Sequence, residues 1–209
     1  RPRAQLLLPR DADSALGVPG EEGPGVLGAV EWIAAMKTNP RTTVNGIRSA
    51  AVIGGGNTAL DVVRELAQLG VSEVRLVYRR GEADMKGYLH EWNAAKKERV
   101  ILVPHAAVTR IVRTNGKVTA LKLVRTQDGK PTSEPLPDLP VDLVVIAIGQ
   151  NKLLDKRGCI AADPRTGATG NPRVFAGGDA VNGGKEVVNA VDEGQRAAHA
   201  IHARIMEGA

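Results

Sequence analysis

The segment GGGNTALD at residues 54–61 directly follows the apolar run AAVI at residues 50–53. Its spacing, Gly54-x-Gly56-x-x-Ala59, is typical of the turn that joins the first strand to the first helix of a dinucleotide-binding fold. Gly54 permits the tight turn, Gly56 lets a diphosphate approach the main chain, and Ala59 lets the helix pack close to the strand. This segment therefore predicts a strand–turn–helix unit that holds a phosphate at the N-terminus of the helix.

Segments of alternating type surround this glycine loop. The pattern of apolar and polar residues predicts strands at 50–53, 74–78 and 100–104, and helices at 57–69 and 88–97. Strand, helix and strand in that order form a parallel βαβ unit. The glycine spacing needs this setting, because a dinucleotide fingerprint has meaning only between a strand and a helix.

The chain on either side of this unit differs in character. A loop rich in glycine and proline at 17–25 leads to a predicted helix from Val26 to Lys37. Further along, Thr114-Asn115-Gly116 predicts a hairpin, because Asn-Gly accepts the positive φ angles of a tight turn. A buried strand at 141–149 and a last helix over 186–206 follow. We therefore predict the α/β fold class: a Rossmann-like NAD(P)-binding domain with a three-layer ββα/βαβ arrangement and a β-meander.

The residues next to the glycines distinguish this loop from other phosphate-binding loops. A nucleoside-triphosphate loop needs GK[ST] after its glycines, and here Asn57 and Thr58 occupy that place. A second glycine cluster, GGK at 183–185, is followed by Glu186 and fails the same test. We expect the dinucleotide to be bound by Gly54, Gly55, Gly56, Asn57, Thr58 and Ala59. The alternative is a plain strand-to-helix turn.

The end of the second predicted strand indicates which nucleotide binds. An NAD site usually carries an acid there, about 20 residues after the glycines, which bonds the ribose 2′-hydroxyl. Here the sequence VYRRGE places Arg79 and Arg80 at that point. Two guanidinium groups suit the 2′-phosphate of NADP through charge-assisted contacts, so we predict NADPH in preference to NADH. The alternative is that both are surface arginines bonded to Glu82 or Asp84.

Composition excludes several other classes of protein. The net charge is +5, but the 28 basic residues are dispersed among 23 acidic ones and aromatic residues make up 2%, so we predict no nucleic-acid partner. No segment reaches the roughly 18 consecutive apolar residues of a membrane span, so we predict no membrane partner. Cys159 is the only cysteine, which leaves no CxxC motif for a cluster and favours the cytoplasm. The histidines lack ligand spacing, so we expect no metal site.

Four segments, in the same order, resemble one family of flavin-dependent oxidoreductases. They are GVPGEEGPGV at 17–26, VIGGGNTALDVVRELAQLGVSEVRLVYRRGEADM at 52–85, DLVVIAIGQN at 142–151 and TGATGNPRVFAGGDAVNGGKEVVNAVDEGQRAAHAIHARI at 166–205. Together they are similar to the small (beta) subunit of NADPH-dependent glutamate synthase and its relatives, including the flavin domain of dihydropyrimidine dehydrogenase. The resemblance implies that the first segment is a crossover loop, the second the NADPH site, and the third a strand that returns to the FAD-binding domain.

The resemblance implies a division of the chain into three parts. Residues 1–48 would be the end of the FAD-binding part and a crossover linker, 49–149 the NAD(P)H-binding domain, and 150–209 the trailing segment of a discontinuous FAD-binding domain. The family's own FAD-binding GxGxxG and its cysteine-rich iron–sulfur segment do not occur before residue 17. The chain also lacks a first methionine, so we expect a C-terminal fragment. Because the GxGxxG for FAD is missing, we expect that this fragment does not bind FAD firmly by itself.

The resemblance also implies residues of a flavin site. Asp179 of AGGD would bond the ribityl chain of FAD, with Gly178 allowing close approach. The helix that begins near Glu186 would direct its N-terminus at the flavin, where a positive helix end stabilises the charge of the reduced ring. The cofactor-binding residues implied in these segments are Gly149, Gln150, Gly178, Asp179, Glu186, Val187 and Val188.

The activity implied is hydride transfer from NADPH to FAD in the intact protein, with the fragment alone inactive. Electrons would leave through iron–sulfur clusters, held in a missing N-terminal region or in a partner, to a large catalytic subunit or another acceptor. Because such transfer needs alignment and not an acid or base, we predict no catalytic side chain. One alternative is a non-catalytic NADP(H)-binding regulatory module. A simple dehydrogenase would need a pair such as Tyr-x-x-x-Lys, but Trp92 stands four residues after Tyr88.

Overall fold

The computed structural model describes residues 12–38, 44–151, 160–182 and 185–207 of the chain. The chain divides into two compact units. One unit is Asp13–Asn151, and the other joins Arg1–Ala12 to Lys152–Ala209. The two-residue strands β1 (Ala12–Asp13) and β10 (Gln150–Asn151) pair with each other.

A parallel sheet forms the centre of the first unit. Its order is β2-β9-β3-β4-β5, and every neighbouring pair is parallel. Successive strand residues point to opposite faces of a sheet, and both faces are covered here, so the strands are mainly apolar, with Ser49, Glu73 and Arg75 as their polar residues. The strands are β2 (Val26–Gly28), β3 (Ser49–Ile53), β4 (Glu73–Val77), β5 (Ile101–Val103) and β9 (Leu143–Ile146).

Three helices cover one face of this sheet. They are α1 (Ala29–Thr38), α2 (Asn57–Gln68) and α3 (Leu89–Lys97), and a short 3₁₀ turn, η1 (Glu82–Asp84), precedes α3. Alternate strand residues such as Val52, Leu76 and Val145 pack with Leu60 and Leu66 of α2 in one hydrophobic core. Burying this apolar stripe is what fixes α2 on the sheet.

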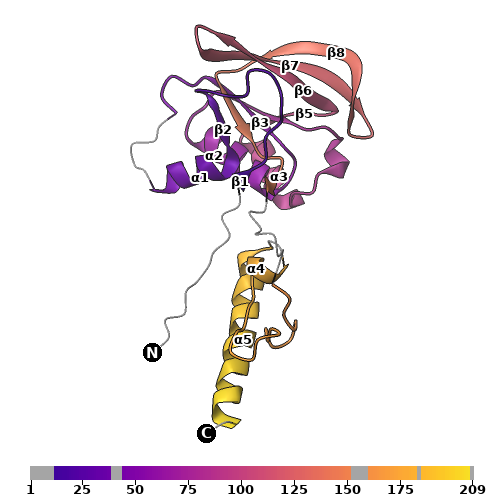
Figure 1. The fold of residues 1–209 in the computed structure, drawn as a ribbon. Helices are drawn as coiled ribbons and strands as arrows, with labels where there is room; N and C mark the ends of the chain where they lie inside the picture. The colour runs from indigo at the N-terminus through magenta and orange to yellow at the C-terminus, as the bar shows by residue number, and fades with distance from the viewer. Residues whose placement is uncertain (1–11, 39–43, 152–159, 183–184, 208–209) are drawn as a thin grey trace. The chain divides into compact units, whose positions relative to one another are not determined.

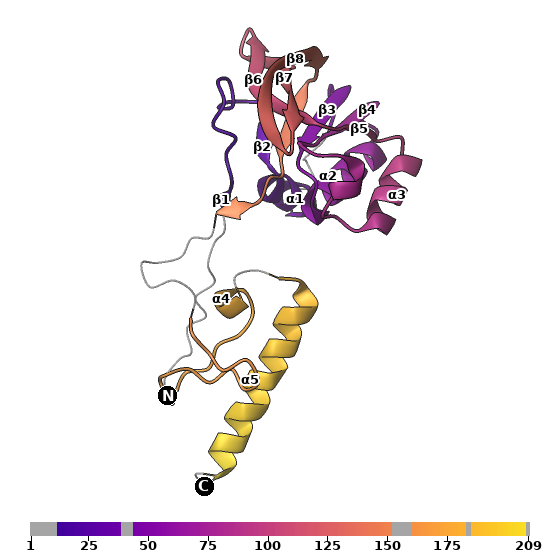
Figure 2. The ribbon, with the colours of Figure 1, turned by 90° about the vertical axis from the view of Figure 1, so that its right-hand side faces the viewer.

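An antiparallel sheet covers the opposite face (Figure 1). Its strands β6 (Ala106–Thr114), β7 (Lys117–Gln127) and β8 (Lys130–Pro140) form a meander. The other alternate strand residues, including Ala51, Val77 and Val144, pack against Ile111 and Leu121 of this meander. The predicted three-layer α/β fold with a separate β-meander is therefore confirmed. Figure 2 shows the same layers from the side.

Two elements of this unit differ from the sequence prediction. The helix expected from Val26 begins at Ala29, because Val26 and Leu27 extend the sheet beside Val144 and Val145 of β9. Strand β8 was not predicted, and it contains Pro131, Pro135, Pro137 and Pro140. Proline cannot donate to a strand ladder, so β8 lies where only one side is paired, at the edge of the meander.

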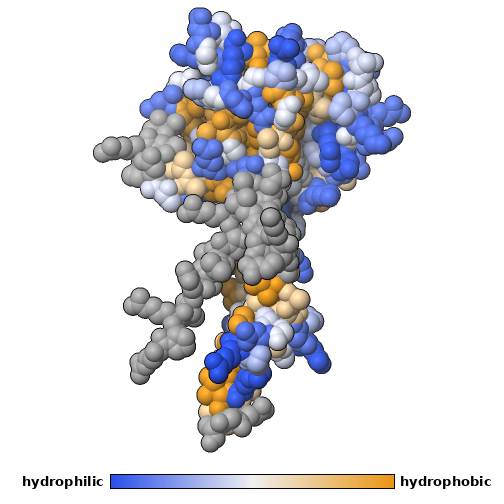
Figure 3. Space-filling view, in the orientation of Figure 1, coloured by the Kyte–Doolittle hydropathy of each residue, from blue (hydrophilic) through white to orange (hydrophobic). Residues whose placement is uncertain are grey.

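The described part of the second unit holds two helices and a looped segment. The helices are α4 (Asp179–Asn182) and α5 (Val187–Glu207), and the preceding segment forms the bridges Ala162↔Thr169 and Ala168↔Phe175. None of its described apolar side chains is buried. Large apolar residues of α5, among them Val187, Ile205 and Met206, are exposed, and Figure 3 shows apolar surface along this helix. Among the described helices of the chain, none is long and apolar enough to cross a membrane.

Candidate dinucleotide-binding site

A cavity of about 580 Å³ lies where β3, β4 and β9 end. The chain runs from β3 to β4 on one side, and β9 lies on the other side of β3. This is the reversal of strand order at which open α/β sheets bind ligands. Seven of the predicted binding residues line the cavity: Gly54, Gly55, Gly56, Thr58, Arg79, Arg80 and Gly149.

The three glycines of the loop do different things. A side chain on Gly54, at a φ of +152°, would lie 3.0 Å from the carbonyl carbon of Ala147 and 3.2 Å from the Cβ of Ala59. A side chain on Gly55 would collide with the ring of Tyr78. A side chain on Gly56 would meet nothing within 4 Å. The first two glycines are therefore needed for packing, while Gly56 leaves an open space next to bare main chain.

The amide groups around Gly56 form an anion-binding arrangement. The Gly56 carbonyl accepts hydrogen bonds from the amides of Ala59 (3.1 Å) and Leu60 (3.2 Å), so α2 begins directly after it. Gly56 provides no side-chain cap. Within the described ranges, the amide N–H groups of Gly56, Asn57 and Thr58 donate to no protein acceptor. Free N–H groups and the positive end of the helix dipole favour a phosphate at this point.

A neighbouring loop braces the glycine loop. The Gly55 carbonyl accepts hydrogen bonds from the amides of Lys86 and Gly87, each at 3.0 Å. The Asn57 Oδ1 accepts a hydrogen bond from the Tyr88 amide at 2.8 Å. Asn57 and the fully buried Ala59 are not among the residues that line the cavity. The Asn57 side chain thus braces the loop and the Ala59 side chain packs in the core, which leaves the main chain of the loop to meet a ligand.

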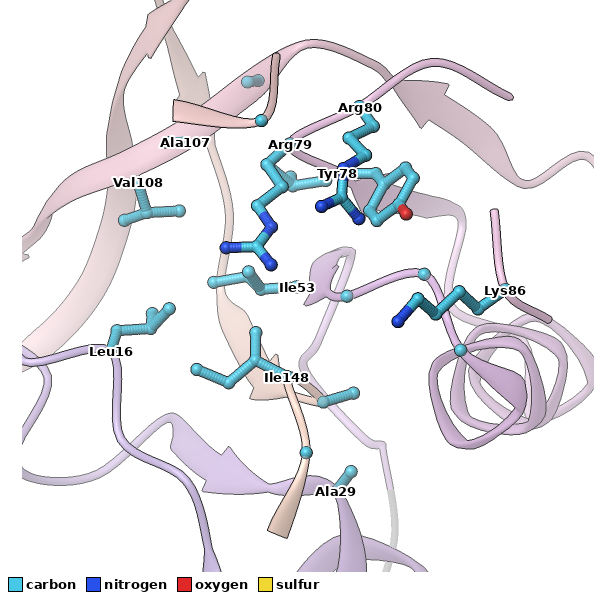
Figure 4. A pocket seen from close by; sticks show the side chains of 18 of the residues that line it. Leu16, Ala29, Ile53, Tyr78, Arg79, Arg80, Lys86, Ala107, Val108 and Ile148 are labelled. Atoms are coloured by element: carbon cyan, nitrogen blue, oxygen red, sulfur yellow. The ribbon is translucent and has the colours of Figure 1, made fainter. Parts of the chain in front are cut away.

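Arg79 and Arg80 follow β4 and line the cavity (Figure 4). Within the described parts of the chain neither forms an ion pair, and the acids suggested as alternative partners are otherwise engaged. Glu82 pairs with Lys96 at 2.9 Å, and this contact lowers the pKa of the Glu82 carboxyl. Asp84 Oδ2 accepts a hydrogen bond from the Gly81 amide at 3.2 Å. Both guanidinium groups are therefore available to an anion.

The main chain of this arginine pair is held by the meander. The Arg79 carbonyl accepts a hydrogen bond from the hydroxyl of Thr126, a buried residue of β7, at 2.6 Å. The Arg80 carbonyl accepts one from the His105 amide at 3.1 Å. A side chain on Gly129, in the turn between β7 and β8, would lie 3.1 Å from Arg80 Nε. The meander thus fixes the direction in which the arginines leave β4.

Three further features of the cavity were not predicted. Lys86 supplies a third cation. The Asp13 carboxylate caps α1, since it accepts hydrogen bonds from the amides of Val30 (3.1 Å) and Glu31 (3.3 Å). Leu16, Val108 and Ile148 make one end of the cavity apolar (Figure 4). These residues come from separate segments and match no spacing, so no sequence signal could have grouped them.

The flavin-site residues implied by the resemblance fall mostly in the second unit. Gly178 has a φ of +66° and lies against Ala190 of α5. Glu193 accepts hydrogen bonds from the Asn182 side chain (3.1 Å) and from the Gly178 amide (2.6 Å), which together lower the pKa of its carboxyl. Asp179 Oδ1 lies 3.4 Å from the Lys185 amide, which donates to it. These bonds join the AGGD turn to α5.

The other implied flavin-site residues are placed as follows. Val187 and Val188, at the start of α5, are 79% and 67% exposed, and Glu186, directly before them, is also exposed. Gly149 lines the cavity of the first unit, and Gln150 belongs to β10. No group of described residues has the composition of a metal site.

A parallel sheet with helices on one face and a meander on the other, and an open glycine turn beside arginines that pair with no described acid, define a Rossmann-like fold of the nucleotide-binding type. The model of the pyridine nucleotide-disulphide oxidoreductase family matches residues 12–194. The chain belongs to this family.

Individual relatives support the more specific resemblance. The chain is 37% identical over 218 residues to the NADP(+)-dependent formate dehydrogenase subunit beta of Moorella thermoacetica, covering 94% of this chain and 31% of that protein. It is 32% identical over 222 residues to the glutamate synthase [NADPH] small chain of Escherichia coli (strain K12), covering 88% and 46%. The expected likeness to the glutamate synthase small subunit is confirmed. The chain spans between about a third and a half of the length of these relatives.

Solved structures give the same fold. Thioredoxin reductase of T. acidophilum matches with a TM-score of 0.71 and 23% sequence identity, over 94% of this chain and 64% of that one. Thioredoxin reductase of Lactococcus lactis also matches with a TM-score of 0.71, at 21% identity. At such identities the likeness concerns the fold alone.

Proposed function

We propose that this chain is the NADPH-binding part of a flavin oxidoreductase subunit similar to the glutamate synthase small subunit. One observation carries the proposal: a glycine turn left open at Gly56 and two arginines that pair with no acid among the described residues line the same cavity. The diphosphate would lie on the amides of Gly56, Asn57 and Thr58, and the 2′-phosphate on Arg79 and Arg80. The relatives that are named for NADP(+) and NADPH support this choice of nucleotide.

The residues of the first unit bind and orient the nucleotide. The open space at Gly56 admits the phosphates to hydrogen-bond distance of the main chain, which a methyl group would prevent. The apolar end formed by Leu16, Val108 and Ile148 would exclude water from a ring placed there. The contribution of the protein is alignment and an electrostatic environment, so we assign no catalytic side chain.

The second part of the proposal concerns FAD in the intact protein. Bound FAD supplies the acceptor for the hydride of NADPH and a route for single electrons to iron–sulfur clusters. Gly178 and Asp179 would contact it, and Glu186 together with Val187 and Val188 at the start of α5 would point at the ring. The positive φ of Gly178 fits such a close approach. Gly149 and Gln150 would belong to the connection between the two cofactor sites.

The proposal keeps residues 49–149, expected from the sequence, as the NAD(P)H-binding domain and adds the segment from Asp13, because β2 and α1 share its sheet and core. Residues 150–209 would belong to the FAD-binding domain. None of the described apolar side chains between 160 and 207 is buried, so this segment needs more chain to form a flavin site. This chain by itself would bind NADPH without turnover. The intact protein would act in the cytoplasm with a large catalytic subunit or an iron–sulfur acceptor.

The nucleotide preference can be tested with the double substitution Arg79→Ala/Arg80→Ala. Two lost charge-assisted contacts of about 1.5 kcal/mol each correspond to a loss of NADPH affinity of roughly 150-fold. NADH has no 2′-phosphate, so its affinity should change less than about threefold. Fluorescence titration of both nucleotides measures the difference. Arg110→Ala, an exposed arginine of β6 outside the cavity, is the control. Equal losses for both nucleotides would refute the preference.

A further inference from the structure

Lys86 occupies a position next to the glycine loop that its sequence context did not suggest. Its amide donates to the Gly55 carbonyl at 3.0 Å, and the Gly87 amide donates to the same oxygen at 3.0 Å. A side chain on Gly87 would lie 3.3 Å from the carbonyl carbon of Gly56. The main chain at 86–87 therefore lies directly against the main chain at 55–56. This contact fixes the root of the Lys86 side chain beside the open glycine.

The Lys86 side chain has no protein counterion in the described parts of the chain, although acids are close in sequence. Glu82 forms an ion pair with Lys96, and the Asp84 carboxylate accepts a hydrogen bond from the Gly81 amide. Lys86 instead lines the cavity, and in Figure 4 its ammonium group points toward the interior. A cation held in this way adds to the positive field of the α2 N-terminus and favours an anion in the cavity.

We infer that Lys86 binds the bridging diphosphate of the dinucleotide and so contributes affinity that does not depend on the 2′-phosphate. The inference rests on the proposed function, because it assumes that a pyridine dinucleotide occupies the cavity. It adds a residue outside the glycine spacing and outside the arginine pair. The ammonium group would complete the set of amide donors at Gly56, Asn57 and Thr58.

The geometry separates the role of Lys86 from that of the arginines. Arg80 lies against Gly129 of the β7–β8 turn, whereas Lys86 is tied to the glycine loop. In Figure 4 the Tyr78 ring is drawn beside the Arg80 side chain, with Lys86 apart from both, and the Tyr78 hydroxyl donates to the Asp84 carbonyl at 2.8 Å. The cavity thus has one cationic side at the end of β4 and another at the start of α2. A dinucleotide with one phosphate group near each of these sides would contact both cationic sides of the cavity.

The inference is tested by measuring how Lys86→Ala changes affinity for ligands with different phosphates. Isothermal titration of the full chain would use NADP⁺, ADP-ribose, which has the diphosphate only, and 2′-AMP, which has the 2′-phosphate only. We expect about a tenfold loss for NADP⁺ and ADP-ribose, the size of one charge-assisted contact, and no change for 2′-AMP. Lys86→Arg should keep most of the affinity. Lys97→Ala, an exposed lysine of α3 outside the cavity, is the matched control.

Each result decides the question. A loss for 2′-AMP and NADP⁺ with ADP-ribose unchanged would overturn the inference and move Lys86 to the 2′-phosphate. Equal affinities of Lys86→Ala and Lys97→Ala for all ligands would also overturn it, while leaving the nucleotide site standing. A wild-type chain that binds none of the three would instead reject the proposed function. Unchanged melting temperature of Lys86→Ala establishes that the variant is folded, since its main-chain bonds do not need the side chain.

Discussion

Substituting alanine at two glycines of the same loop should separate folding from binding. At Gly56 the added methyl group enters open space, and the φ of −98° is one that alanine adopts readily. At Gly54 the φ is +152°, and the methyl group would collide with the Ala147 carbonyl group. Gly56→Ala should therefore leave the fold intact and block the ligand. Gly54→Ala should damage the fold itself.

The sizes of these effects follow from the contacts. In Gly56→Ala, alanine is a poorer N-cap than glycine, which destabilises the fold, but it also lowers the conformational entropy of the unfolded chain, which stabilises the fold. These two effects nearly cancel, so the free energy of unfolding should change by less than about 1 kcal/mol. Holding a phosphate off the amides loses about two charge-assisted bonds, or roughly 3 kcal/mol, which is a loss in affinity of about 150-fold. For Gly54→Ala, backbone strain and the collision should cost about 3 kcal/mol, or a melting temperature lower by roughly 6–12 °C.

Thermal unfolding followed by circular dichroism and NADPH titration of the same samples would measure both effects. The expected pattern is a normal melting temperature with lost binding for Gly56→Ala, and a low melting temperature for Gly54→Ala. Normal NADPH binding by a folded Gly56→Ala chain would refute the reasoning, because the phosphate could not then lie on that amide.

Two further predictions concern the support of the site and the second unit. Thr126→Val removes the hydroxyl that donates to the Arg79 carbonyl, so the melting temperature should fall by about 2–4 °C and NADPH affinity should fall more than NADH affinity. If Thr126→Val changed the affinities for NADPH and NADH by the same factor, this bond would not position Arg79. In hydrogen exchange of the full chain, amides of α5 should exchange far faster than those of β3, because β3 is buried and no described side chain of α5 is. Equal protection of α5 and β3 would contradict the account of the second unit.

The sequence predicted the centre of the fold because its signals are local. In the segment from Ser49 to Gln68, alternate residues of the strand meet two separate cores, and the apolar stripe of the helix meets one of them. Asn115-Gly116 encodes the β6–β7 turn directly, and Asn115 has the positive φ of 51° that such a turn requires. In these places local preference and tertiary packing agree, so the pattern alone was sufficient.

The features that were missed depend on distant parts of the chain. Strand β8 is rich in proline and looks like a loop, but pairing with β7 along one edge makes it a strand. The sequence pattern of Val26 and Leu27 fits a helix, but these residues form a strand because they pair with β9. Lys86 becomes part of the site only because its amide meets the Gly55 carbonyl, thirty-one residues earlier in the chain. No spacing rule contains these pairings.

The central claim is that a dinucleotide lies across the turn between β3 and α2, and a crystal structure of the chain soaked with NADP⁺ tests it most directly. The account predicts density for the diphosphate over the amides of Gly56, Asn57 and Thr58, with the 2′-phosphate between Arg79 and Arg80. Nucleotide density at another place on the chain, with this turn left empty, would contradict the claim.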